Sequence, residues 1–313
     1  MKVFVAGASG VIGRRLLPML RDRGHEVVGM TRTPEKAPLL ESLGAQAVVC
    51  DVYDARGLTK AVTSARPDAV VHELTDLPQA FEPRRLEEQL AGNDRIRTEG
   101  THNIVEGTRA AGTRRLVAQS IAFAYVPNGG RPRREEDPLD LEAAWPWRRT
   151  VEAVAELERL VTRTDGIDGV VLRYGYLYGP GTAYAAEGSY ASLVRRRGFP
   201  IAGRGTGIFS FVHVDDAATA TVDALERGRT GIYNIVDDEP APLAAWLPVY
   251  AEALGAQPPR RVPLLLVRLT GGRRAAGMFS RGAGASNEKA KRELGWEPRY
   301  ASWRDGFRAE LGR

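Results

Sequence analysis

The sequence predicts an α/β fold built on a parallel sheet, and two observations carry this prediction. Apolar strands and helical stretches alternate through the first half of the 313 residues. The first strand is followed by a glycine-rich turn, a helix and a second strand, in the order of a dinucleotide-binding βαβ unit. Strands that are joined through helices in this way lie parallel in one sheet.

The elements follow from the hydrophobic periodicity and from the residues that begin and end helices. Six strands are predicted, at Lys2–Ala6, Glu26–Thr31, Gln46–Cys50, Ala69–His72, Arg115–Ser120 and Gly169–Tyr174. The helices between them are predicted at Arg14–Asp22, Glu35–Leu43, Ala55–Thr63, Leu86–Ala111, which Gly112 ends, and Val151–Thr164.

The second half of the chain is less regular. A strand is predicted at Ser210–His213, and helices are predicted at Asp215–Glu226 and, after a proline, at Pro240–Ala256. The segment Gly271–Ala285 is rich in Gly, Arg and Ala, and it is predicted to be a mobile loop or a lid.

The turn after the first strand has the composition of a pyrophosphate-binding loop. Gly7 permits a tight turn, Gly10 lets backbone N–H groups approach the anion, and Gly13 lets the next helix pack near the sheet. The N-terminus of that helix then faces the anion. The predicted cofactor-binding residues of this loop are Gly7, Ser9, Gly10, Val11, Ile12 and Gly13.

Composition excludes several classes of protein. A single cysteine, Cys50, excludes a disulfide framework and a cysteine-based metal cluster, and no metal site is predicted. The longest apolar run near the C-terminus, Val262–Val267, is ended by Arg268, far short of a membrane span, and no signal peptide is expected. The net charge is +5, but acidic residues are interspersed with the basic ones, so no nucleic-acid partner is expected. We expect a cytoplasmic protein.

Seven motifs occur in a fixed order along the chain: Ala6–Gly13, Cys50-Asp51-Val52, Val70-Val71-His72, Gly100–Val105, Arg173–Gly181, Phe211–Asp216 and Ala290–Trp296. Together they resemble the extended short-chain dehydrogenase/reductase family, which contains NAD(P)-dependent epimerases, dehydratases and reductases. The resemblance spans essentially the whole chain. It implies a Rossmann domain of about seven parallel strands, in the doubly wound order, with a smaller C-terminal domain that closes a substrate cleft.

The implied division assigns residues 1–172 to the dinucleotide-binding domain, to which residues 210–238 return. Residues 173–209 and 239–313 form the substrate-binding part. Relatives often dimerise through two long helices, here Leu86–Ala111 and Val151–Thr164, so a homodimer is one expectation. Val151, Val154, Leu157 and Val161 recur at helical spacing, which suits either a dimer interface or the domain core.

The cofactor is predicted from the end of the second strand. An acidic residue there would bind the ribose hydroxyls of NAD, but this chain has Thr31 and Arg32, which suit the 2′-phosphate of NADP. NADP(H) is therefore favoured over NAD(H), although Arg32 could instead stack on adenine. By resemblance, Asp51 accepts from the adenine amino group or serves as a turn residue. The resemblance also places Val52, Leu74 and Thr75 at the cofactor.

The catalytic positions depart from the family pattern. Hydride-transferring relatives use Tyr-x-x-x-Lys, in which the lysine lowers the tyrosine pKa and the tyrosine exchanges the alcohol proton. This chain has Trp147 and Val151 there, or, in a register shifted by three residues, Thr150 and Val154. Ser120 lies one residue before the usual catalytic hydroxyl position and is either catalytic or a cap of the strand end.

Substrate contacts are predicted from tyrosines and one tryptophan. Tyr176 replaces an asparagine that nucleotide-sugar enzymes turn towards the substrate, which makes a nucleotide sugar an unfavoured substrate. Its phenol either replaces the missing proton donor or packs as one more aromatic. The predicted pocket residues are Tyr125, Trp147, Tyr184 and Tyr190. His213 is predicted to belong to a structural hinge between the domains and not to the catalytic groups.

Three functions remain open, in order of preference. The first is an NADP-dependent oxidoreductase or epimerase-like enzyme that acts on a small organic molecule with a non-standard proton donor. The second is a cofactor-binding protein without turnover, such as a sensor. The third is a non-redox cyclase, isomerase or dehydratase that reuses the cleft.

Overall fold

The computed structural model describes residues 1–78, 80, 82, 85–127, 131–270, 277, 280 and 282–312. Its centre is a seven-stranded parallel sheet of order β11-β6-β5-β4-β1-β2-β3. The strands are β1 (Lys2–Ala6), β2 (Glu26–Thr31), β3 (Gln46–Val49), β4 (Ala69–His72), β5 (Arg115–Ile121), β6 (Asp168–Tyr174) and β11 (Gly231–Ile235). The strand order reverses between β1 and β4, which is where a doubly wound sheet opens a crevice for its ligand. The α/β prediction is confirmed.

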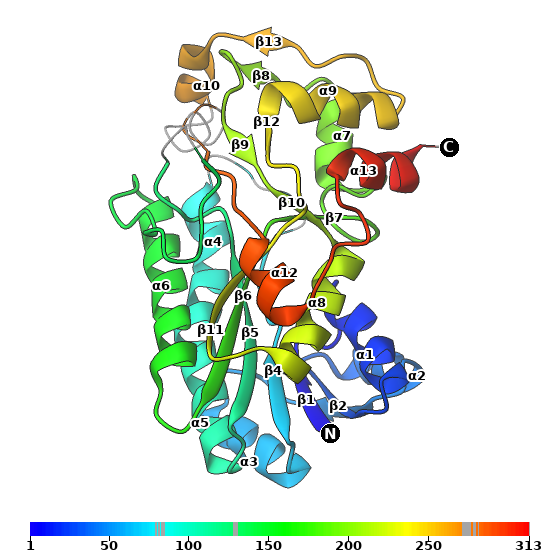
Figure 1. Ribbon diagram of the computed structural model, residues 1–313, viewed down its shortest axis with the longest axis vertical. Helices are drawn as coiled ribbons and strands as arrows, with labels where there is room; N and C mark the ends of the chain where they lie inside the picture. Colours follow the sequence, from blue (N-terminus) through cyan, green and yellow to red (C-terminus); the bar gives the residue numbers. More distant parts are fainter. Residues whose placement is uncertain are drawn as a thin grey trace.

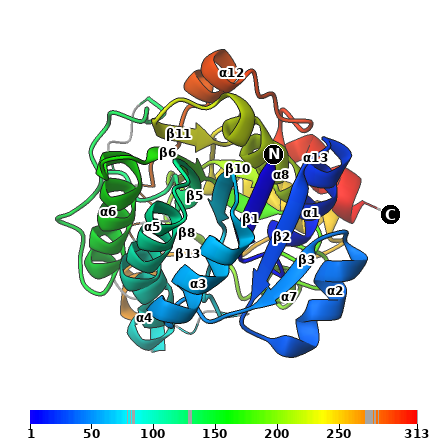
Figure 2. The same cartoon turned by 90° about the horizontal axis from the view of Figure 1, so that it is seen from below.

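Helices cover both faces of this sheet (Figures 1 and 2). One face packs against α1 (Gly13–Asp22), α2 (Ala37–Ser42), α8 (Val214–Arg227) and α12 (Glu288–Leu294). The other face packs against α3 (Ala55–Ala65), α5 (Thr101–Ala110) and α6 (Trp147–Arg163). None of the described helices has the length and apolarity to cross a membrane.

The long helix predicted at Leu86–Ala111 consists of three pieces. A π-helical turn at Ile96–Gly100 separates α4 (Leu86–Arg95) from α5, and Gly112 follows the end of α5 with a positive φ of 71°. The four apolar residues at helical spacing on α6 are between 0% and 2% exposed within the single chain. Their spacing is therefore accounted for by the core of the chain itself.

A second, smaller core lies beyond the C-terminal edge of the sheet, at the top of Figure 1. It is rich in aromatic rings, with Phe211 and Trp246 fully buried at its centre. Its short strands pair as β10-β7, β12-β9 and β13-β8. Its elements are β7 (Tyr176–Tyr178), α7 (Ser189–Arg195), β8 (Ile201–Ala202), β9 (Ile208–Phe209), β10 (Phe211–His213), β12 (Ala241–Pro242), α9 (Leu243–Ala253), β13 (Arg261–Val262), α10 (Leu264–Thr270) and α13 (Trp303–Leu311).

The element predictions need two corrections, and one further prediction is largely untested. The strand β11 was not predicted, because its five residues include a glycine and a polar asparagine, Asn234, that is fully buried. The helix expected at Pro240–Ala256 begins later, as α9, because Ala241 and Pro242 pair with β9. Most of the segment predicted as a loop or lid, Gly271–Ala285, lies outside the described residues.

Candidate active site

The glycine turn between β1 and α1 has no room for larger residues. Gly7 has a φ of +91°, and a Cβ there would lie 2.6 Å from the backbone carbon of Glu73. A Cβ at Gly13 would collide with the carbonyl oxygen of Gly7, whereas Gly10 is exposed and its Cβ would lie 3.1 Å from that oxygen. Gly7 and Gly13 are thus required by the backbone itself, and Gly10 keeps the outer surface of the turn open.

The same turn is suited to an anion. Helix α1 begins at Gly13 and has no acidic residue in its first turn, so its N-terminal backbone dipole is not neutralised locally. Ser9, Val11 and Ile12 lie in this turn, with Val11 partly exposed and Ile12 buried. A pyrophosphate is the chemical group that such a turn binds in dinucleotide folds.

The residues predicted to bind the adenosine ribose and its 2′-phosphate lie at the end of β2. The Thr31 hydroxyl lies 3.4 Å from the Ser9 hydroxyl, which joins the end of β2 to the glycine turn. The Arg32 side chain is 60% exposed, and its Nη2 lies 3.5 Å from a carboxylate oxygen of Asp76. An exposed pair of this length is weak, so the guanidinium can exchange Asp76 for a ligand phosphate.

The remaining predicted cofactor residues lie at the ends of β3 and β4. The Asp51 carboxylate accepts a hydrogen bond of 2.9 Å from the backbone N–H of Tyr53, which is the turn role considered for it. Val52 is buried and its carbonyl accepts from Asn103. Leu74 is partly buried and Thr75 is exposed, both directly after β4.

A cavity of about 930 Å³ lies where β5 and β6 end. Its described lining comes from the segment after β5, the start of α6, β7, β9 and α10. The residues that matter most for its chemistry are Phe123, Tyr125, Trp147, Tyr176, Leu264 and Arg268. A mostly apolar space with a few polar groups is typical of a small-molecule site.

One wall of this cavity consists of aromatic rings. The rings of Phe123 and Tyr176 stack at a centroid distance of 4.4 Å, and the Trp147 ring lies nearly parallel to Phe123 at 6.3 Å. Tyr176 also packs against Phe209 at 4.8 Å. The three rings stack on one another and make this wall of the cavity aromatic and apolar.

The positions of the family's acid–base pair hold no acid or base in either register. Trp147 lines the cavity, but Val151 is fully buried in the core beneath α6. In the shifted register Thr150 is 1% exposed and Val154 is fully buried, and neither is among the described residues that line the cavity. A lysine at either valine position would place an ammonium group in an apolar core.

The structure places Ser120 in a buried polar network. The Ser120 hydroxyl donates to Glu158 at 2.9 Å, and Glu158 forms a two-point ion pair with Arg173 at 2.7 and 2.6 Å. Arg173 also donates to the Tyr125 hydroxyl at 2.6 Å, which in turn donates to Asn234 at 2.7 Å. Ser120 is 1% exposed and is not one of the described cavity residues, so its position favours the structural alternative.

This network also determines what Tyr125 can do. Tyr125 lines the cavity, but its hydroxyl is engaged by Arg173 and Asn234. Burial raises the pKa of Tyr125 to about 12, although the neighbouring Arg173 lowers it. Its ring is therefore a cavity wall, and its phenol is a poor proton donor at neutral pH.

Two predicted pocket residues are misplaced. Tyr184 is 4% exposed and packs with Tyr190 at 4.7 Å and with Phe211 at 5.5 Å inside the second core. Neither Tyr184 nor Tyr190 is among the described residues that line the cavity. The loop that carries them folds back onto α9, whose Tyr250 hydroxyl donates to the Tyr184 carbonyl, so the aromatic rings fill the core instead of the pocket.

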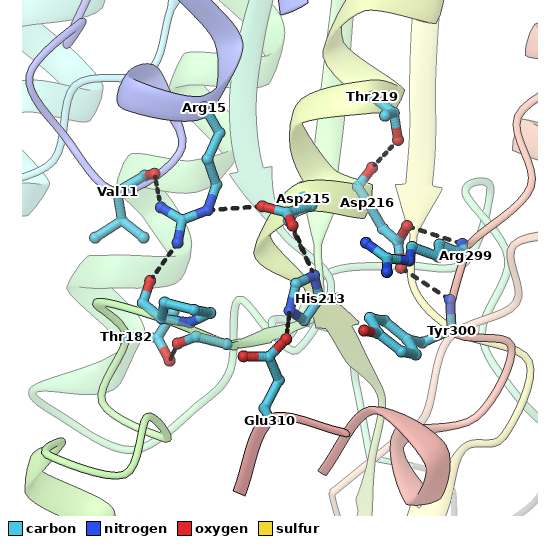
Figure 3. A network of polar contacts seen from close by, with 12 residues as sticks. Val11, Arg15, Thr182, His213, Asp215, Asp216, Thr219, Arg299, Tyr300 and Glu310 are labelled. Atoms are coloured by element: carbon cyan, nitrogen blue, oxygen red, sulfur yellow. Dashed lines mark hydrogen bonds and ion pairs between the residues drawn. The ribbon is translucent and has the colours of Figure 1, made fainter. Parts of the chain in front are cut away.

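His213 lies in a network of polar contacts with Asp215 and Glu310, as Figure 3 shows. Its Nδ1 accepts from the backbone N–H of Asp215, and its Nε2 lies 3.2 Å from a carboxylate oxygen of Glu310 on α13. Asp215 pairs with Arg15 at 2.7 Å, and Arg15 also donates to the carbonyl of Val11 in the glycine turn. His213 is 1% exposed and is not among the described residues that line the cavity, and its role as a hinge stays a prediction.

A buried carboxyl beside the glycine turn was missed by the sequence analysis. Glu73 follows β4 and accepts from the Tyr174 hydroxyl at 2.9 Å, with the Thr221 hydroxyl at 3.5 Å. Burial raises the pKa of Glu73 to about 8, so the group is mostly protonated at neutral pH. A protonated carboxyl beside the turn adds no negative charge near a bound pyrophosphate. The acidic residue directly after an apolar strand was the only signal in the sequence.

A family model for the NAD dependent epimerase/dehydratase family matches residues 3–236, which is most of the chain. The chain belongs to this family. A Streptomyces protein named 3-diazoavenalumate denitrifying reductase is 47% identical over 318 residues, which cover 99% of this chain and 100% of that protein. A Stigmatella aurantiaca protein named 4-hydroxy-2-methyl-3-oxo-4-farnesyl-3,4-dihydroquinoline-1-oxide ketoreductase is 25% identical and covers 96% of this chain and 92% of its own length.

Solved structures of epimerase/dehydratase proteins have the same fold. Human epimerase family protein SDR39U1 with NADPH superposes with a TM-score of 0.75 at 21% identity, covering 99% of both chains. Thermus thermophilus UDP-glucose 4-epimerase with NAD has a TM-score of 0.76 at 24% identity and covers 99% of this chain and 98% of its own.

Membership of this family, together with the reductase names of its relatives, identifies the chain as an NAD(P)-dependent oxidoreductase. The family is described as NAD dependent, so its cofactor is a nicotinamide dinucleotide. The residues of the glycine turn fit its pyrophosphate, because Gly10 keeps the exposed surface of the turn free of a side chain. The recognition made from the seven motifs is confirmed.

Proposed function

We propose that this protein is an NADPH-dependent reductase that removes a diazo group from an aromatic acid as N₂. The observation that carries the proposal is the cavity wall at the catalytic position, where Trp147 replaces the proton-donating tyrosine and Val151 lies in the core. The 47% identical Streptomyces relative is named a denitrifying reductase of a diazo compound. The aromatic wall supports a substrate with an aromatic ring, which would pack against these apolar side chains.

The chemistry explains why a proton donor can be absent. Ketone reduction turns the carbonyl oxygen into an alkoxide, which needs an acid at hydrogen-bond distance. Hydride addition to the terminal nitrogen of an aryldiazonium ion gives a neutral aryldiazene. The diazene then loses N₂ while its N–H hydrogen moves to the ring carbon, so hydride and diazonium together give arene and N₂. The cofactor supplies the hydride, and the cavity has to orient the substrate and exclude water.

Several features support NADPH as the cofactor. The two residues directly after β2 are Arg32 and Thr33 and neither is a carboxylate, and Arg32 is exposed with only a weak pair to Asp76. Thr31 and Thr33 add polar groups beside it, with the Thr31 hydroxyl accepting from the Thr33 N–H at 3.2 Å. This set would hold a 2′-phosphate by charge-assisted hydrogen bonds.

The test is turnover of the diazonium salt of an aminocinnamate by the purified protein. NADPH oxidation and release of N₂ should rise together, well above the rate without protein. The matched control is the variant Gly10→Trp. Its turnover should equal the rate without protein, because the variant cannot bind the cofactor. Equal rates for the wild type and this control would overturn the proposal.

Ketone reduction with Tyr176 as proton donor is the second candidate. It is favoured by the position of Tyr176 in the cavity wall, stacked on Phe123. The same experiment distinguishes it: turnover of aromatic ketones without N₂ release from the diazonium substrate would place this function first.

A further inference from the structure

The cavity is chemically asymmetric from one wall to the other. Its inner wall, where β5 and β6 end, is formed by the rings of Phe123, Trp147 and Tyr176. The segment before α6 adds two carboxylates, Asp140 and Glu142. Arg268 on α10 is the only basic residue among the described lining residues.

Helix α10 presents one side to the cavity. Leu264, Leu265 and Arg268 all line it, and positions i, i+1 and i+4 of a helix share one face. Val267 points the other way and is 7% exposed in the second core, which fixes the helix in place. Figure 1 shows α10 beside β13, at the end of the molecule away from the central sheet.

The guanidinium of Arg268 is available to a ligand. Its side chain is exposed, and among the described residues the structure gives it no ion pair. Leu264 and Leu265 line the cavity together with it, so its charge lies beside apolar surface. An exposed arginine beside an apolar cavity is a suitable partner for a carboxylate.

We propose that Arg268 selects substrates that carry a carboxylate. The planar ring of the substrate lies against the aromatic wall, and its acid group reaches α10, where Arg268 binds it. Asp140 and Glu142 repel the acid group from the opposite segment, so the charges of the cavity set a single orientation. This inference deepens the proposed function, since it names the acid that the diazo reaction would use.

The experiment measures binding of cinnamate and of cinnamamide by calorimetry, with NADP⁺ present. The two probes have the same planar skeleton and differ in charge. Wild-type protein should bind cinnamate about 10- to 100-fold more tightly, the factor expected of a charge-assisted pair. In Arg268→Gln that preference should disappear through loss of cinnamate affinity, with cinnamamide affinity unchanged. Arg268→Lys keeps the positive charge but cannot form two parallel hydrogen bonds to the carboxylate. Its affinity for cinnamate should lie between those of the wild type and Arg268→Gln.

The matched control is Arg261→Gln, which removes an exposed arginine of β13 that is not among the described lining residues. It should bind both probes as the wild type does. Cinnamate affinity that survives in Arg268→Gln would overturn the inference, as would equal affinity of the wild type for the two probes. Failure of the proposed function gives a different result, because the preference for cinnamate would then remain while the diazonium salt is not reduced.

Discussion

The glycine turn and the substrate cavity differ in how their residues are brought together. The turn is one contiguous segment, and its geometry follows from local backbone rules: Gly7 and Gly13 are the residues that the structure leaves no space to replace. The cavity is assembled from segments that are more than 140 residues apart, such as Phe123 and Arg268. Contiguous sites are therefore readable from sequence, and assembled ones require the fold.

The largest effect should come from filling the surface of the turn. Gly10→Trp should abolish dinucleotide binding, because the indole would occupy the space of the pyrophosphate, while the exposed position leaves the fold intact. We expect a loss of more than about 100-fold in affinity in a titration of NADPH fluorescence. Unchanged affinity in a folded variant would refute the assigned nucleotide site.

The next largest effect should come from the buried polar network of Ser120, Glu158 and Arg173. Glu158→Leu should destabilise the fold by about 3–5 kcal/mol, because it leaves the Arg173 charge buried without its partner. Ser120→Ala removes one neutral donor to a carboxylate and should cost only about 1–2 kcal/mol, with turnover retained. Denaturant melts of both variants and of the Glu158→Leu, Arg173→Met pair check this. A loss of turnover in Ser120→Ala that its loss of stability does not explain would indicate that Ser120 takes part in catalysis.

These predictions also show where sequence reasoning ends. The sheet, the glycine turn and the family could be predicted, because strand periodicity and glycine spacing are local signals. Tyr184 was wrongly expected in the pocket, since a tyrosine after a glycine loop has the same local signal whether it faces a cavity or a core. Arg268 was noted only as the end of an apolar run, because its cavity position depends on the packing of α10 against the second core.

The pH dependence of stability tests whether the buried carboxyl of Glu73, beside the glycine turn, is protonated. Its pKa rises from 4.5 to about 8 on burial, so the folded protein keeps a proton that the unfolded chain releases above pH 4.5. Stability is then full below pH 4.5 and falls as the pH rises to 8. Relative to Glu73→Gln, which does not titrate, the wild type should lose roughly 2–4 kcal/mol between pH 5 and 8. Parallel stability curves in urea would contradict a protonated Glu73.

A smaller effect is expected at the end of β2. Arg32→Ala should lower the affinity for NADPH by about 10- to 100-fold and the affinity for NADH much less. The charge-assisted hydrogen bond that is lost reaches only the 2′-phosphate, which NADH lacks. Affinities of both cofactors are compared by fluorescence titration. Lys36→Ala, a basic residue of the following 3₁₀ turn, is the control for a general loss of positive charge. Equal losses for NADPH and NADH in Arg32→Ala would mean that the arginine only stacks on adenine.

The smallest effect is expected at Tyr176, and it decides between the two candidate functions. A positioned general acid contributes about 10²- to 10⁴-fold, so Tyr176→Phe would lose that much turnover if the phenol protonated an alkoxide. Loss of N₂ from a diazene needs no such donor, and the phenylalanine ring keeps the stack on Phe123. We therefore expect less than about a threefold change in diazonium reduction.

The double variant Trp147→Tyr, Val151→Lys tests whether restoring the family's catalytic residues restores ketone reduction. Val151 is fully buried, so its ammonium would lie in the apolar core and the family's chemistry would not return. A large gain in ketone reduction by that variant would show that the cavity is an ordinary scaffold of the family that lacks only its catalytic pair.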